Sequence, residues 1–266
     1  MKRTSLLIAA VGATALVLAG CSSNDSTTDS ASSSTQASAK STTKSAPLDM
    51  SQFEQLPAVP APAGATVDCT YAPAAGAAKT VDTPTSTGVP AEGTVNVQLT
   101  TTAGPIGMEL NRTAAPCTVN SMVSLVEQKY FDDTPCHRLV TSPGLQILQC
   151  GDPSGQGTGG PGFGFANEYP TTVYAENDPA LSLPVVYPRG TLAMAHSSQP
   201  DSNGSQFFLV YDDSLLPPDY TVFGTIDEAG LATIEKIAAD GDDGSMGATG
   251  GGAPNTPITI ETAVVA

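Results

Sequence analysis

The sequence predicts a mainly β domain over residues 92–266, a closed antiparallel barrel capped by helices. Three observations predict it: many short apolar runs, glycine-rich turns between them, and only two well-separated stretches with helical periodicity. This pattern is typical of a sheet that closes on itself. The length of about 175 residues is ordinary for one domain.

The first predicted strands form a hairpin. Val95, Val97 and Leu99 alternate with polar residues, which is the pattern of a half-buried strand. Gly104 and Pro105 then mark a turn, and the apolar run 106–110 is the returning strand.

Two segments have the period of a helix. Pro116 suits the first turn of the first helix, where an N–H group would have no partner in any case. The residues on the apolar face of this helix are Val119, Met122, Val123 and Val126. The second helix follows Asp227, and its apolar face carries Leu231, Ile234 and Ala238.

The remaining apolar runs predict further strands. They span residues 138–141, 145–150, 191–194, 207–210 and 222–226. Ile258, Ile260 and Thr262 lie at alternate positions and predict a closing strand.

Residues 1–20 predict an export signal. Lys2 and Arg3 precede the apolar run 6–18, which is shorter than the roughly 20 residues of a bilayer-spanning helix. Small residues lead up to Cys21, an arrangement that resembles the lipobox of bacterial lipoproteins. The resemblance implies cleavage before Cys21, lipidation of its thiol, and anchoring at the extracytoplasmic face of a cell membrane. Plain secretion with an incidental cysteine is the alternative.

Two segments separate the signal from the domain. Residues 21–46 are mostly serine and threonine, and we expect a disordered tether because they cannot bury enough apolar surface to offset ordering entropy. Residues 47–91 are rich in alanine and proline and predict an extended arm. The isolated apolar anchors of this arm are Phe53, Leu56, Cys69 and Tyr71.

Charge and cysteine content limit the partners. The formal net charge of −16 disfavours nucleic acid, because an acidic surface repels phosphates. After Cys21, the remaining cysteines are Cys69, Cys117, Cys136 and Cys150. An even number in an exported protein favours disulfides, and three pairings are open. Thiols that stay reduced are one alternative; zinc is another, although no Cys-x-x-Cys pair is present.

Four short motifs in the domain resemble those of the cyclophilins, a family of peptidyl-prolyl cis/trans isomerases. They are Cys136-His137-Arg138-Leu139-Val140, Leu148-Gln149-Cys150-Gly151-Asp152, Asn203-Gly204-Ser205-Gln206-Phe207-Phe208 and Tyr220-Thr221-Val222-Phe223-Gly224. Their order and spacing are similar to the family over residues 92–266. The resemblance implies an eight-stranded closed barrel with a helix over each open end. It also implies substrates that are proline-containing polypeptides, with no cofactor and no metal.

The resemblance assigns roles to individual residues. Arg138 is the donor to the prolyl nitrogen, Gln149 orients Arg138, and Phe208 forms the floor of the proline pocket. The other substrate-binding residues that it implies are Ile147, Ala195, His196, Gln206, Leu216 and Tyr220. Strand alternation places Phe207 and Phe208 on opposite faces, so we expect Phe207 in the core.

The chain also departs from the common family pattern. His196 stands where asparagine is usual, Tyr220 replaces a histidine of many relatives, and Gln146 replaces a common pocket aromatic. His137 could be proposed as a general base, but bond rotation needs no proton transfer, so a packed residue is the expected interpretation.

These observations predict a monomeric isomerase that acts on X-Pro bonds of exported proteins as they fold at the cell envelope. A cyclophilin fold that binds proline segments without turnover is one rival, and a structural role in the envelope is another. The glycines of residues 155–160 fit a dinucleotide fingerprint, but that motif requires a helix directly afterwards. Pro161 and Gly162 follow instead, so we expect a loop.

Overall fold

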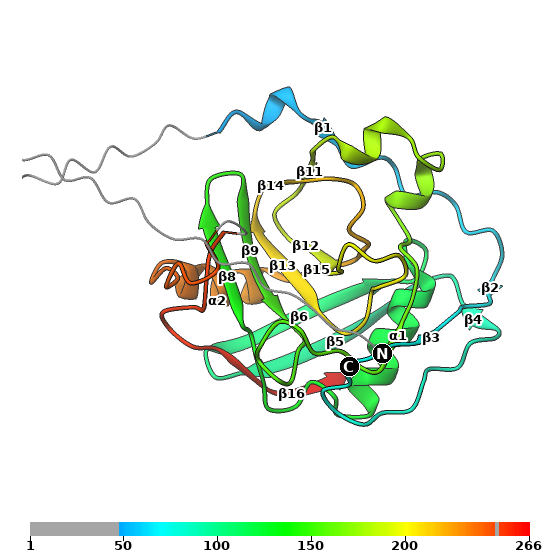
Figure 1. Ribbon diagram of the computed structural model, residues 1–266, viewed down its shortest axis with the longest axis horizontal. Coiled ribbons are helices and arrows are strands. Elements are labelled where there is room, and N and C mark those ends of the chain that lie inside the picture. The colour runs from blue at the N-terminus through cyan, green and yellow to red at the C-terminus, as the bar shows by residue number, and fades with distance from the viewer. Residues whose placement is uncertain (1–47, 248–249) are drawn as a thin grey trace, which may run out of the picture. The chain divides into compact units, whose positions relative to one another are not determined.

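The alternating apolar runs form the strands of one large curled sheet (Figure 1). The computed structural model describes residues 48–247 and 250–266, which lie in one compact unit. The predicted signal, the lipidation residue Cys21 and the tether 21–46 lie outside the described residues. In order across the sheet, the strands are β7 (Thr134–Pro135), β16 (Thr259–Val265), β5 (Thr94–Thr101), β6 (Gly104–Asn111), β15 (Val222–Ile226), β12 (Thr191–Met194), β13 (Phe207–Asp212), β9 (Leu145–Cys150) and β8 (Arg138–Ser142).

The mainly β prediction with two α-helices is confirmed, but the prediction of a closed eight-stranded barrel is wrong. The sheet is a curled half-barrel of nine strands, and no ladder between described residues joins its two end strands, β7 and β8. The reason is that β7 and β8 are pieces of one segment, separated only by Cys136 and His137. The Cys136 N–H donates to Ile258 O (2.9 Å) and the His137 N–H donates to Gln149 O (3.1 Å). One segment therefore serves both ends of the sheet and cannot pair with itself.

Both predicted helices are present, and Figure 1 shows them at opposite ends of the curled sheet, where both pack into the same core. In α1 (Pro116–Glu127), Val119, Met122 and Val126 are buried; in α2 (Glu228–Ala238), Leu231 and Ile234 are buried. Of the helices in the described ranges, none is long and apolar enough to span a bilayer.

The two helices begin differently. Asp227 caps α2, because its carboxylate accepts a hydrogen bond from the Gly230 N–H (2.7 Å). Ala115, at the corresponding position of α1, has no side chain that can cap. The carboxylate of Glu168 takes this role from a distant loop, accepting from the backbone N–H groups of Cys117 (3.0 Å) and Thr118 (2.8 Å).

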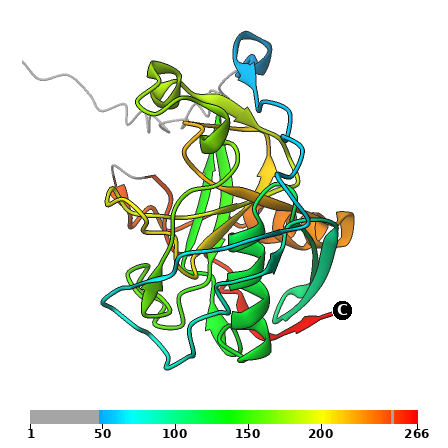
Figure 2. The ribbon, with the colours of Figure 1, turned by 90° about the vertical axis from the view of Figure 1, so that its right-hand side faces the viewer.

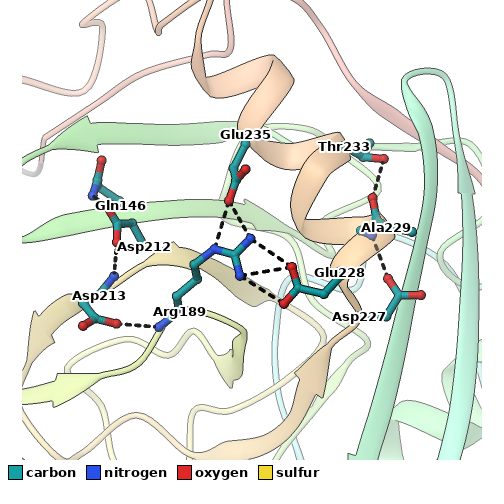
Figure 3. Close-up of polar contacts among 10 residues, drawn as sticks. Gln146, Arg189, Asp212, Asp213, Asp227, Glu228, Ala229, Thr233 and Glu235 are labelled. Atoms are coloured by element: carbon teal, nitrogen blue, oxygen red, sulfur yellow. Dashed lines mark hydrogen bonds and ion pairs between the residues drawn. The ribbon is translucent and has the colours of Figure 1, made fainter.

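Arg189 links the approach to β12 with α2 (Figure 3). Its guanidinium lies 3.2 Å from the Glu228 carboxylate and 2.8 Å from that of Glu235. All three groups are on the surface, where ion pairs contribute about 0–1 kcal/mol each. Arg189 is therefore held by two carboxylates, and it is distant in sequence from Arg138.

Several short elements escaped the sequence analysis. These strands are β1 (Glu54–Gln55), β2 (Thr66–Val67), β3 (Ala72–Pro73), β4 (Val89–Pro90), β10 (Phe163–Gly164), β11 (Val185–Tyr187) and β14 (Ser214–Leu216), and the 3₁₀ helices are Met50–Gln52, Thr171–Val173 and Pro179–Ser182. β1 pairs with β11, β3 with β10, and β2 with β4. Elements of two to four residues are too short to show a period.

The predicted disulfides are present, which excludes zinc and free thiols at these four cysteines. Of the three pairings, the structure has Cys69–Cys117 and Cys136–Cys150, with Cα–Cα distances of 5.6 and 4.0 Å. The first attaches the arm to α1, and Figure 2 shows the arm passing across this helix. The second joins the segment before β8 to the end of β9.

The central strands bury a different cluster on each face. Leu139, Leu148 and Phe207 pack in the main core between the sheet and the helices. Their chain neighbours Val140, Ile147 and Phe208 belong to a separate outer cluster, on the other side of the sheet. Successive side chains of a strand point to opposite faces, so one set of strands supplies both a core and an outward apolar surface.

Candidate active site

Three residues lie side by side in one row on the outer face of the sheet. Arg138 of β8 is paired with Gln149 of β9, and Gln149 is paired with Phe208 of β13. Directly opposed side chains in antiparallel strands project from the same face at close spacing. The three residues that the sequence assigned to catalysis are thus neighbours, and we call them the outer row.

A chain of hydrogen bonds holds the guanidinium of Arg138. Its Nη1 donates to Gln149 Oε1 and its Nε donates to Gly250 O, both at 3.2 Å. The Gln149 amide in turn donates to Gln206 Oε1 (2.9 Å), and the Gln206 amide donates to Gly159 O (3.0 Å). Burial lowers the pKa of Arg138, but an arginine still carries its charge at neutral pH. The result is a fixed, partly buried cation.

The apolar residues predicted for the proline pocket meet in the outer cluster. Ile147 and Phe208 are buried there, and Ala195, Leu216 and Tyr220 pack against them. The rings of Phe208 and Tyr220 meet edge to face, with their centroids 5.6 Å apart. This grouping provides an apolar surface of the kind that a pyrrolidine ring would contact.

Tyr187 fixes the loop after β14, which carries Tyr220 and so contributes to the apolar surface just described, here called the apolar wall. It is fully buried in β11, and its hydroxyl lies 3.0 Å from the carbonyl oxygens of both Pro217 and Tyr220. The sequence analysis did not identify Tyr187, since nothing in the run 185–187 indicates a partner thirty residues away.

His196 packs against the same wall. Its ring stacks on Tyr220 at 4.7 Å, and its two ring nitrogens lie 2.8 Å from Ser197 O and 2.9 Å from Asp219 O. The neighbouring Ala195 N–H donates to Gln206 O at 2.9 Å. Residues 195–196 therefore lie beside Gln206 with the histidine ring tied to the Tyr220 loop, an arrangement that the usual asparagine would not reproduce.

His137 is a packed residue. The residue is 8% exposed, and neither ring nitrogen has a hydrogen-bond partner among the described residues. Burial lowers its pKa, so the ring is neutral at pH 7. A Cβ added to Gly157 would lie 3.1 Å from this ring, so His137 supports the loop 155–160 from below.

Asp152 organises that loop. Its carboxylate is fully buried and accepts hydrogen bonds from the backbone N–H groups of Ser154, Thr158 and Gly159. Burial alone would raise its pKa, but these hydrogen bonds hold the pKa below the usual value. The residues after Gly160 lead into β10 and not into a helix, so the predicted loop is confirmed and the dinucleotide motif is absent here.

A cavity of about 460 Å³ adjoins the outer row. The residues that line it include Gln149, Ala195, His196 and Gln206, as well as the loop 157–164. Ala74 and Ala75 of the arm also line it. Sequence reasoning assigned no role to these alanines, and no signal in an alanine-rich segment could have singled them out.

Residues 96–265 match the model of the family described as "Cyclophilin type peptidyl-prolyl cis-trans isomerase/CLD". The chain belongs to this family. Its cyclophilin domain therefore contains the outer row, the apolar wall and most of the cavity lining, whereas the arm lies before the matched residues.

Relatives and solved structures agree with this assignment. "Probable peptidyl-prolyl cis-trans isomerase B" of Mycobacterium leprae is 56% identical over 200 residues, 74% of this chain and 66% of that protein. The protein of the same name from Mycobacterium tuberculosis (strain H37Rv) is 53% identical over 197 residues, 73% and 62% respectively. The chain thus spans slightly less than two thirds of these relatives.

Two crystal structures of a Cryptosporidium parvum cyclophilin-type isomerase share the fold. One has a TM-score of 0.51 and 28% identity, covering 65% of this chain and 98% of that chain. The other, obtained in the presence of the dipeptide Ala-Pro, has a TM-score of 0.50 and 30% identity, covering 64% and 98%.

Proposed function

We propose that this protein is a peptidyl-prolyl cis/trans isomerase. The observation that carries the proposal is the outer row: a charged guanidinium, held on two sides, beside the apolar floor formed by Phe208. The mycobacterial relatives are named for this activity, and the Ala-Pro dipeptide used with the Cryptosporidium protein supports proline-containing substrates.

The proposed mechanism requires only binding and electrostatics. Rotation about a peptide bond faces a barrier of about 18–20 kcal/mol, because the nitrogen shares its lone pair with the carbonyl group. When the bond twists, the lone pair returns to the prolyl nitrogen and can accept a hydrogen bond. A donor lowers the barrier if it binds this twisted state better than the planar one. Arg138 is that donor, Gln149 fixes its direction, and the pocket formed by Ile147, Phe208, Leu216 and Tyr220 holds the ring.

The proposed setting is the outer surface of a cell membrane. The signal 1–20 and the lipobox-like cysteine, Cys21, support export and lipidation, and the two disulfides suit an oxidising compartment. The clients would then be exported polypeptides whose X-Pro bonds isomerise during folding, over tens to hundreds of seconds without a catalyst.

The test is cis-to-trans conversion of an Ala-Pro peptide by the full chain in detergent, compared with Arg138→Ala. The full chain is needed, because a domain that begins at Glu92 would lack Cys69, the partner of Cys117. We expect about a hundredfold to a thousandfold loss of kcat/KM, the usual effect of removing one donor to a transition state. Arg189→Ala, which removes a surface guanidinium paired with Glu228 and Glu235, should retain activity.

The principal rival is a module that binds proline segments without turnover. Equal, uncatalysed rates for the folded wild type and Arg138→Ala would support that module and reject the isomerase. Rapid exchange in both proteins would keep the isomerase and remove Arg138 from its mechanism.

A further inference from the structure

The arm contributes to the cavity beside the outer row, although it precedes residues 96–265 that match the family. Ala74 and Ala75 line this cavity together with residues 195–197 and Gln206. Both alanines are exposed. The cavity wall that they form is therefore a property of this chain and not of the matched domain.

The segment that contains Ala74 and Ala75 is held on its N-terminal side by covalent and aromatic contacts. Cys69 is bonded to Cys117 in α1. The hydroxyl of Tyr71 donates to Cys117 O (2.8 Å), and its ring meets Phe163 and Phe165 edge to face, at 5.5 and 5.6 Å. Tyr71 thus clamps the chain three residues before Ala74.

Backbone hydrogen bonds hold Ala74 itself and the residues that follow the segment. The Ala74 N–H donates to Gly162 O (2.9 Å), and the Ala78 N–H donates to Gly160 O (2.8 Å). The ammonium group of Lys79 then donates to Tyr130 O (2.9 Å). Since both flanks are fixed, Ala74 and Ala75 form a constant boundary.

The lining of the cavity is uncharged. Glycine, alanine, serine and amide side chains predominate, and none of the described residues that line it is Asp, Glu, Lys or Arg. The nearby carboxylate of Asp152 is buried under the loop, and its oxygens already accept hydrogen bonds from that loop. A charged group that entered would lose water without gaining a counter-ion, whereas an uncharged side chain would not.

The cavity is continuous with the outer row, because Gln149 belongs to both. Ala195 and Gln206 also line the cavity, and Ala195 packs against the apolar cluster that holds Phe208. A peptide whose proline lay on Phe208 would therefore pass the cavity with a residue next to its X-Pro unit.

We propose that Ala74 and Ala75 are specificity-determining residues that bound a subsite for an uncharged side chain upstream of the X-Pro bond. The proposal rests on the proposed isomerase function and adds its preference for sequence. The small size of the two alanines is what leaves the subsite open.

The experiment compares the full-length wild type with Ala75→Trp, on peptides that differ two positions before proline: Gly, Leu, Glu or Lys. Both kcat/KM and peptide Kd are measured. We expect the wild type to favour Leu over Glu and Lys, and Ala75→Trp to lower kcat/KM and weaken binding about tenfold for the Leu peptide, with little effect on the Gly peptide. Ala63→Trp, at an exposed arm residue that does not line the cavity, is the matched control.

The outcomes separate this proposal from the proposed function. An Ala75→Trp effect that is equal for the Gly and Leu peptides, or no effect, overturns the subsite. If no peptide is isomerised, the proposed function fails, and Kd still decides the subsite: selective weakening of the Leu peptide supports it, and unchanged Kd rejects it.

Discussion

The outer row and the adjoining cavity form one groove, and its two sides are built by different means. On the proline side, the outer row is carried by adjacent strands β8, β9 and β13, whose ladders place Arg138, Gln149 and Phe208 in register. On the cavity side, Ala74 and Ala75 belong to an irregular segment held by a disulfide, a tyrosine and a few backbone hydrogen bonds.

The difference shows how function can be divided between regular and irregular structure. Hydrogen-bonded pairing between strands fixes the relative positions of neighbouring side chains. Side chains that must act together are therefore well placed on paired strands. A pinned segment places a boundary without constraining the strands. We therefore expect perturbation of the ladder side to change turnover on every peptide, and perturbation of the arm to change stability and preference.

Removing each disulfide separately tests this division with the largest expected effects. The sequence separations of 48 and 14 residues correspond to roughly 4 kcal/mol for Cys69–Cys117 and 3 kcal/mol for Cys136–Cys150, if the bonds act by constraining the unfolded chain. Urea unfolding of the double alanine variants measures these losses. Because Cys150 follows Gln149 directly, the second variant should also lose turnover on all peptides, including the Gly peptide.

The first variant supplies the contrast. Without Cys69–Cys117, the segment that contains Ala74 and Ala75 should become more mobile. Preference for the Leu peptide should therefore fall while turnover of the Gly peptide persists. A uniform loss of turnover in this variant, matching that of the Cys136–Cys150 variant, would show that the two sides of the groove are not independent.

The ladder side was largely predictable from the sequence. Alternation predicted β5, apolar runs predicted β6, β9 and β13, and alternation separated Phe207 from Phe208, which pack in different clusters. Alternation fails near the end of the chain, where the register of β16 shifts between Ile260 and Thr262 and leaves Thr262 exposed. Such a bulge depends on the partner strand, which is not visible in a local pattern.

The arm side was not predictable, for the same physical reason. β3 is two residues long, and its partner β10 lies about ninety residues later, so no period reveals it. The buried carboxylate of Asp152 and the half-buried carboxylate of Glu168 are likewise defined by hydrogen bonds from a loop and a helix end. The way one segment serves both β7 and β8, which leaves the barrel without a closing ladder, also depends on tertiary contacts alone.

A smaller loss of stability is expected when the hydrogen bonds at the start of α1, where Cys117 attaches the arm, are removed. Glu168 accepts hydrogen bonds at the start of α1, beside Cys117, from the Thr118 hydroxyl (2.6 Å) as well as from two backbone N–H groups. Glu168→Ala leaves these donors unpaired, so we expect a loss of about 1–3 kcal/mol in urea unfolding. Glu176→Ala, at an exposed position of the following loop, should change stability by less than about 0.5 kcal/mol. Equal losses in both variants would show that the cap does not anchor α1.

The smallest expected effect concerns His137, on the ladder side. Burial lowers its folded pKa below 6.5, so the unfolded chain takes up a proton more readily than the folded chain. The contribution of this residue to stability is thus complete above pH 6.5 and is lost as pH falls through the folded pKa, by about 1.4 kcal/mol for each unit of pKa difference. His137→Leu should remove this acid dependence in urea unfolding between pH 5 and 8, and His196→Asn, which changes the other histidine, should retain it.

Activity at neutral pH separates packing from catalysis at His137. Neither ring nitrogen has a hydrogen-bond partner among the described residues, so leucine removes no such bond, and kcat/KM should fall less than about tenfold. A general base would instead account for a factor of about 10²–10⁴. A loss of that size in folded His137→Leu, with a wild-type rate that declines as the histidine is protonated, would bring proton transfer into the mechanism and make His137, which directly precedes Arg138, part of the active site.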